Sequence, residues 1–190
     1  MCFMALVEIT PPAFDVETHM VYATAENFTG AAIYKRAECY LHGDAAALLA
    51  RSIDLAGELG LRLKIFDAYR PAEAQWLLWS HNPDPDFLSD PRRGSPHSRG
   101  VAIDVTLIDG SGRDLDMGSP VDGAGPLARH GCTGITPAAQ RNRVILLGLM
   151  AAAGWDHYLN EWWHYQLFEP RRYPLLDESA AGTAMMRSSP

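Results

Sequence analysis

The chain has 190 residues, a length that fits one domain and leaves little room for a second. Hydrophobic residues make up 47% of it and charged residues 21%, which supplies a packed core and excludes a disordered chain. The net charge of −7 disfavours nucleic acid as a partner, and no apolar run reaches the roughly 18 residues of a membrane-spanning helix.

The first half of the chain predicts two strands and two helices. Residues 5–9 form a short predicted strand. A helix is predicted from Asp44, as its N-cap, to Gly60, because apolar residues recur there every three or four positions. Residues 61–68 alternate apolar and basic side chains and predict a strand, and Pro71 suits the first position of a helix that reaches about Ser80.

The second half begins with residues 81–96, whose Pro, Asp, Ser and Gly content predicts an ordered loop over one edge of the domain. A strand is predicted over 100–108, with aliphatic residues on one face and Asp104 on the other. A helix follows over 137–153, capped by Thr136; it is apolar nearly all round and is therefore predicted to be central. The last strand spans 162–168, and a tail begins at Arg171 and frays at 188–190.

Strands and helices are mixed without regular βαβ alternation, which favours an α+β fold with a central, mostly antiparallel sheet and helices packed on it. We expect one domain over residues 1–190, with its core at about 6–176 and a C-terminal tail at 177–190. Cys2, Cys39 and Cys132 are widely spaced and form no CxxC pair, which predicts free thiols and a cytoplasmic location. The N-terminus lacks the basic region of a secretory signal.

Two short motifs carry candidate metal-binding side chains. His97 precedes a Ser-Arg-Gly turn and Asp104 lies in the strand after it, so both side chains can reach one point. A carboxylate inside an apolar strand is costly unless it is paired, so a metal site and a hydrogen-bonded buried aspartate are equally weighted for this pair. In Glu161-Trp-Trp-His164 the spacing alone favours a surface glutamate and a core histidine.

Taken together, the two motifs predict a metal site with a base beside it. His97, Asp104 and His164 supply two imidazoles and one carboxylate, which leave one coordination position open for water. Glu161 is then a spare carboxylate, the group that a zinc hydrolase needs as its general base. The same three ligands can also hold Fe(II) in an oxygenase.

Arg70 ends a predicted strand, where a rigid backbone can aim its guanidinium into a cleft. A fixed guanidinium can stabilise the oxyanion of a tetrahedral intermediate. The alternative role is a structural ion pair with Asp67, and Arg70 considered alone favours that alternative.

Further motifs lie along the chain in this order: Tyr22-Ala-Thr with Asn27-Phe-Thr-Gly30, Asp67-Ala-Tyr-Arg-Pro71, His97-Ser-Arg-Gly100 with Ala102-Ile-Asp104, Met117-Gly118, Gln140-Arg-Asn-Arg143 and Glu161-Trp-Trp-His-Tyr165. From about Leu6 to Leu176, they resemble the D-alanyl-D-alanine dipeptidases of the VanX type. The resemblance implies one Zn²⁺ per chain and the α+β fold shared with D,D-carboxypeptidases and the hedgehog signalling domain. It implies hydrolysis of the small dipeptide D-alanyl-D-alanine to two D-alanines.

The resemblance also implies roles for individual residues. It gives the zinc ligands, the general base and the transition-state stabiliser as the residues assigned above: His97, Asp104, His164, Glu161 and Arg70. It further suggests that Asp122 binds the ammonium group of the substrate and that Ser95 and Tyr22 line the dipeptide pocket. Of the five tryptophans, Trp162 is the one expected to contact substrate.

The chain departs from the family around Asp122. Val121 stands where phenylalanine is common, residues 123–130 replace an acidic stretch, and Pro96 stands where a polar residue is usual. These differences concern the choice of dipeptide and leave the metal site intact.

The same residues are compatible with functions other than dipeptide hydrolysis. A zinc D,D- or L,D-carboxypeptidase would act on longer peptidoglycan peptides, and a silent binding module would lack the base or the oxyanion arginine. Glu161 and Arg70 favour hydrolysis over the binding module and over the Fe(II) oxygenase. Recycling of cell-wall dipeptide and glycopeptide resistance are both compatible with this chemistry, and a homo-oligomer is compatible with the sequence.

Overall fold

Two strands form the centre of the main sheet. In the computed structural model, which describes residues 6–187, β4 (Arg62–Asp67) pairs antiparallel with β5 (Ala102–Ile108). On one side, β2 (Val16–Thr18) pairs with β4 in parallel; on the other, β7 (His164–Gln166) and then β6 (Asp156–His157) continue the sheet antiparallel. The order β2-β4-β5-β7-β6 confirms the predicted α+β fold with a mostly antiparallel sheet. A separate two-stranded sheet joins β1 (Val7–Glu8) to β3 (Tyr40–Leu41).

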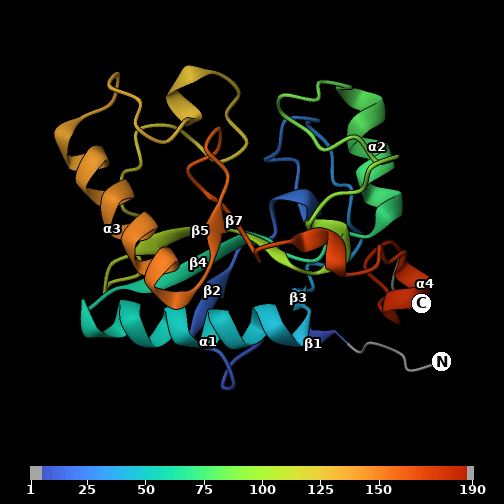
Figure 1. Ribbon diagram of the computed structural model, residues 1–190, viewed down its shortest axis with the longest axis horizontal. Helices are drawn as coiled ribbons and strands as arrows, with labels where there is room; N and C mark the ends of the chain where they lie inside the picture. The colour runs from blue at the N-terminus through green and yellow to red at the C-terminus, as the bar shows by residue number, and fades with distance from the viewer. Residues whose placement is uncertain (1–5, 188–190) are drawn as a thin grey trace.

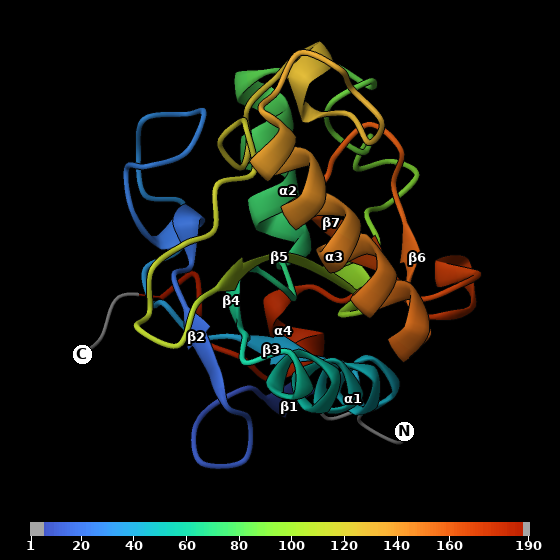
Figure 2. The same cartoon turned by 90° about the vertical axis from the view of Figure 1, so that its left-hand side faces the viewer.

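Three helices enclose the sheet (Figure 1). Helix α1 (Gly43–Glu58) lies below it, and α2 (Ala72–His81) and α3 (Pro137–Ala153) stand above it on opposite sides of the molecule. Figure 2 shows α3 descending towards α1, against which it packs. Because both faces of the sheet are covered, every residue of β5 is buried, including those on the face of Asp104. None of the helices within residues 6–187 is long and apolar enough to span a bilayer.

Several helix details differ from the sequence-based expectations. The N-cap of α1 is His42, whose Nδ1 accepts a hydrogen bond from the Asp44 amide at 3.1 Å. Pro71 is the N-cap of α2 and not its first residue. Thr136 caps α3 as predicted, but the helix is not central, because Val144 is 67% exposed. One side of α3 packs against α1 and the sheet, so the apolar residues on its other side face solvent.

The chain beyond Arg171 is folded and not a free tail. The single turn η4 (Pro170–Arg172) leads to α4 (Glu178–Ala181), and Leu176 and Met185 are buried in the core on either side of it. Tyr69 donates a hydrogen bond to the Leu176 carbonyl at 3.1 Å, which ties this segment to the end of β4. Residues 188–190, expected to fray, and residue 5 of the first predicted strand lie outside the described residues.

Candidate active site

Strand register places three ionisable residues in one row across the sheet. Asp104 on β5 lies opposite Asp67 on β4 and opposite His164 on β7. The register of β4 shifts between Ile65 and Asp67, and such bulges re-aim the side chains beside them. Two carboxylates placed side by side in a buried sheet need cationic partners, so cationic side chains or a metal ion must lie next to this row.

His97 reaches the row from the turn before β5. It begins the 3-10 turn η2 (His97–Arg99), which ends at Gly100 with φ of 68°, a left-handed conformation that glycine adopts without strain. A Cβ at Gly100 would also lie 2.8 Å from Leu6 and 3.1 Å from the His42 amide nitrogen. The predicted Ser-Arg-Gly turn is therefore present, and it brings the imidazole back over the start of β5.

The two imidazoles and Asp104 present three acceptor atoms to one point. His97 Nδ1 lies 2.7 Å from the Ala68 carbonyl, and His164 Nε2 lies 3.1 Å from Gln166 Oε1. If the ring protons lie on those two nitrogens, the arrangement usual for metal-binding histidines, His97 Nε2 and His164 Nδ1 present lone pairs to the same point. These nitrogens lie 3.1 Å apart, and Asp104 Oδ1 lies 3.4 Å from the first and 3.1 Å from the second.

Three facing acceptors repel one another unless a cation lies between them. Tetrahedral zinc with N and O ligands at about 2.0–2.1 Å separates those ligands by roughly 3.3–3.4 Å, close to the distances found here. The donor set therefore fits Zn²⁺, and within residues 6–187 this trio is the one cluster able to hold a metal. Burial alone would raise the pKa of Asp104, but the two histidines hold it well below its usual range.

Glu161 stands beside the trio without belonging to it. Its Oε2 lies 3.9 Å from His164 Nδ1, and its side chain is only 14% exposed. Burial raises the pKa of Glu161 to about 8, against the opposing effect of His164. A carboxylate that readily accepts a proton near neutral pH, beside three side chains able to hold a metal, has the properties of a general base.

Arg70 forms both of the arrangements considered from the sequence. Its Nε and Nη2 contact Asp67 Oδ2 at 2.9 and 2.8 Å, and Nη1 donates to Gln75 Oε1 at 2.8 Å. Its guanidinium also lies 4.8 Å from the centre of the Tyr22 ring and lines the same pocket as the acceptor trio. A guanidinium has five N–H groups, so two remain for a ligand once these three contacts are made.

Eight of the nine candidate residues line one pocket of about 270 Å³, a volume just below the roughly 300–1,000 Å³ of pockets for drug-sized ligands. Besides the trio, Glu161 and Arg70, these are Tyr22, Ser95 and Asp122. Ser95 Oγ accepts the His97 amide at 3.2 Å. Tyr22 donates to Asp122 Oδ1 at 3.0 Å, while Asp122 Oδ2 is buried without a hydrogen-bond partner.

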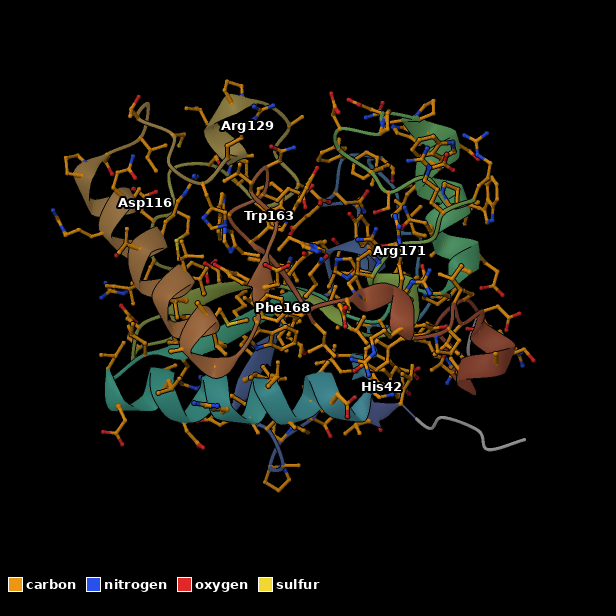
Figure 3. All side chains as sticks on the ribbon, in the orientation of Figure 1. His42, Asp116, Arg129, Trp163, Phe168 and Arg171 are labelled. Atoms are coloured by element: carbon orange, nitrogen blue, oxygen red, sulfur yellow. The ribbon has the colours of Figure 1, made fainter. Side chains whose placement is uncertain are left out.

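Trp162 is the candidate that the structure places elsewhere. Its indole N–H donates to Ser119 Oγ at 3.0 Å, and it lines a separate pocket together with Val121. Trp163 lines the cleft instead, and Figure 3 shows it above the sheet and below Arg129. The reason is that β7 begins only at His164, so strand alternation does not extend to the two tryptophans in the turn before it.

Other residues of the site are only weakly indicated by the sequence. Asp67 is expected there only as a partner for Arg70, yet it is fully buried and also accepts a hydrogen bond from Tyr34 at 2.8 Å. Gln75 joins Arg70 to the loop 82–96 through the Ser89 carbonyl at 2.7 Å. That loop supplies Phe87 and other walls of the pocket, and an apolar Phe-Leu pair within a polar loop was the available signal.

Comparison with known proteins agrees with this geometry. A family model described as D-ala-D-ala dipeptidase matches residues 3–176. A D-alanyl-D-alanine dipeptidase of Escherichia coli (strain K12) is 46% identical over 171 residues, which cover 90% of this chain and 89% of that protein. Those of Streptomyces coelicolor and Enterococcus faecalis are 35% and 32% identical, each over 78% of this chain and 84% of the relative. The chain therefore belongs to the D-Ala-D-Ala dipeptidase family of metallopeptidases.

Proposed function

We propose that this protein hydrolyses D-alanyl-D-alanine to two D-alanines, with one zinc ion held by His97, Asp104 and His164. The observation that carries the proposal is the convergence of these three acceptor atoms with Glu161 and Arg70 in a single small pocket. The similarity to D-alanyl-D-alanine dipeptidases of other bacteria supports this dipeptide as the substrate.

Glu161 is the proposed proton carrier. A zinc ion bound by the trio would supply a Lewis acid and would lower the pKa of a water molecule to about 7. The Glu161 carboxylate takes one proton of the attacking water and later delivers it to the nitrogen of the leaving amine. With a metal ion bound by the trio, Glu161 would favour its ionised form more strongly, which would oppose the effect of burial on its pKa.

Arg70 is the proposed oxyanion stabiliser. Asp67 and Gln75 fix the guanidinium before substrate arrives, so its two remaining N–H groups need no reorganisation when charge develops on the peptide oxygen. The ion pair with Asp67 and the catalytic role are therefore compatible, because the first prepares the second.

Asp122 is the proposed partner for the ammonium group of the dipeptide. Its Oδ2 is buried without a partner, and a buried carboxylate needs a cation or a proton. A peptide extended at its N-terminus presents an amide at that point and has no charge to offer. This supports a dipeptidase over a carboxypeptidase acting on longer peptides.

We also propose a cytoplasmic location, which the free thiols of Cys39 and Cys132 support.

The deciding experiment measures bound metal and product on the same sample. We expect one zinc per chain by elemental analysis, and D-alanine release from D-Ala-D-Ala that a chelator abolishes and added zinc restores. Glu161→Ala should keep the metal and lose roughly 10²- to 10⁴-fold in kcat. The control is Glu58→Ala, an exposed carboxylate on α1.

Three results would contradict the proposal. Near-normal hydrolysis by the Glu161 variant would remove the base assignment. Iron in place of zinc would point to the oxygenase alternative. Faster cleavage of an acylated tripeptide than of D-Ala-D-Ala would point to a D,D- or L,D-carboxypeptidase.

A further inference from the structure

Residues 115–135, which we name the connecting segment, join β5 to α3 and form one wall of the active site. Their regular secondary structure is the single turn η3 (Pro126–Ala128), and stretches this long without secondary structure are uncommon in compact domains. The segment carries Asp122, whose φ of 57° is unusual for a residue other than glycine. Something outside the segment must therefore hold it in shape.

The first turns of α3 provide that hold. Arg143 is 4% exposed, and its Nε donates to the Met117 carbonyl at 2.6 Å. Nη1 contacts the Arg129 carbonyl at 3.1 Å and Cys132 Sγ at 3.3 Å. Nη2 contacts Ser119 Oγ at 3.1 Å and the Leu127 carbonyl at 2.8 Å. A guanidinium has five N–H groups, and these five acceptors all belong to the connecting segment.

Two neighbours of Arg143 reinforce the attachment. Gln140 donates to the Cys132 carbonyl, and Asn142 donates to the Asp116 carbonyl at 2.8 Å. Arg141, the second residue of this Gln-Arg-Asn-Arg motif, is exposed. The motif therefore turns three side chains towards the segment and one towards solvent.

The segment in turn holds the chain next to Glu161. Ser119 Oγ accepts the Trp162 indole N–H at 3.0 Å, and the Ala128 carbonyl accepts the Trp162 amide at 2.9 Å. Arg143 also lies 5.5 Å from the centre of the Trp162 ring. The Arg143 guanidinium therefore supports two parts of the active-site wall, the turn that carries Asp122 and the residue that follows Glu161.

We propose that Arg143 is a positioning residue that sets Asp122 and Glu161 through the connecting segment without touching the pocket. The inference rests on the proposed function, because it assigns ammonium binding to one of these carboxylates and proton transfer to the other. The metal ligands lie on β5, β7 and η2, outside the segment. Loss of Arg143 should therefore disturb substrate binding and turnover while zinc binding persists.

The test compares Arg143→Met, Arg143→Lys and Arg141→Met as zinc-loaded holoenzymes, with rates divided by bound zinc. A misplacement of about 1 Å can cost roughly 10²-fold, so we expect Arg143→Met to lose about that factor in kcat/KM, with KM raised and kcat lowered together. Lysine keeps the charge with fewer donors and should restore part of the loss. Arg141→Met should match the unsubstituted protein.

A second measurement does not depend on the dipeptide. Arg129 lies in the connecting segment and is exposed, so trypsin should cut after it faster in the Arg143→Met holoenzyme than in the Arg141→Met holoenzyme. An inactive unsubstituted holoenzyme would overturn the proposed function, and the trypsin rates would still show whether Arg143 holds the segment.

The positioning role is overturned by unchanged trypsin cleavage, or by kcat and KM within about twofold of the unsubstituted protein. It is also overturned by a lower kcat at unchanged KM that matches lost zinc or lost folded protein, because such a result indicates a structural role alone. If Arg143→Met does not fold, Arg143→Lys decides the question by the same measures.

Discussion

Replacing Asp122 with asparagine is expected to separate substrate recognition from folding. Asparagine has nearly the same shape and also tolerates the positive φ of 57° at this position. Its amide oxygen can still accept the 3.0 Å hydrogen bond from Tyr22. The substitution therefore removes one negative charge and changes little else.

The folded protein holds that charge in an unfavourable place. Burial, followed by the nearby Asp104, raises the pKa of Asp122 from 3.8 to about 7. This difference corresponds to roughly 4 kcal/mol against the ionised form. Because the folded pKa exceeds the unfolded one, the carboxyl group lowers stability as the pH rises from about 4 to above 7. Metal-free Asp122→Asn at pH 8 should therefore unfold at a temperature equal to or above that of the unsubstituted protein.

Catalysis should respond in the opposite direction. Truncating one partner of a buried charge pair costs roughly 2–5 kcal/mol, or about 30- to 3,000-fold in kcat/KM at 1.4 kcal/mol per tenfold. The assay is D-alanine release from D-Ala-D-Ala by the zinc-loaded enzyme, with Asp86→Asn, on the exposed loop, as the control that removes the same charge. Hydrolysis of N-acetyl-D-Ala-D-Ala, which lacks the ammonium group, should change little. A kcat/KM for Asp122→Asn within threefold of the unsubstituted enzyme would refute the reasoning.

Three further changes test other parts of the structure. Arg70→Lys keeps a cation but loses the two guanidinium nitrogens that contact Asp67, so kcat should fall roughly 10²- to 10³-fold while the zinc content stays constant. A near-normal kcat would exclude Arg70 as the oxyanion donor. Cys132 should react with a thiol reagent in the native protein faster than Cys39, because burial raises the pKa of the Cys39 thiol. Peptide mapping after labelling measures which cysteine reacts first, and equal rates would contradict the prediction. Met185→Ala should lower the free energy of unfolding by about 2–5 kcal/mol in denaturant titrations, since this side chain is 0% exposed. An unchanged midpoint would show that the C-terminal segment does not stabilise the domain.

The sequence predicted the acceptor trio because its spacing rules are local. The turn between His97 and Asp104 is short, and its glycine permits the left-handed backbone that folds the imidazole back over the strand. An acidic side chain within an apolar strand is a signal that needs no knowledge of the partner strands. Placing His164 next to Asp104 requires β5 and β7 to be neighbours in that register, which local spacing does not show. The two motifs were joined on chemical grounds, because two imidazoles, one carboxylate and a spare glutamate make up a hydrolytic metal site.

Predictions failed where long-range packing decides the outcome. The apolar residues of α3 favoured a central helix, but the sheet and α1 cover only one side of it and leave Val144 exposed. The segment after Arg171 looked polar enough for a tail, yet Leu176 and Met185 find apolar space that other parts of the chain create. Trp162 and Trp163 lie in the turn before β7, where strand alternation does not apply, and Trp162 is hydrogen-bonded to Ser119 and Ala128 of the connecting segment while Trp163 lines the cleft.

Arg70 shows why two interpretations of one residue need not exclude each other. A charged side chain just after a strand is compatible with either an ion pair or a catalytic role, and from the sequence Arg70 considered alone favours the ion pair. In the structure Asp67 and Gln75 take three of the five N–H groups and thereby fix the plane and direction of the other two. A freely rotating arginine would lose side-chain entropy on meeting an oxyanion, whereas this one has lost it on folding. In the proposed mechanism the buried ion pair is therefore part of the catalytic geometry, and Asp67 contributes to it although it does not line the active-site pocket.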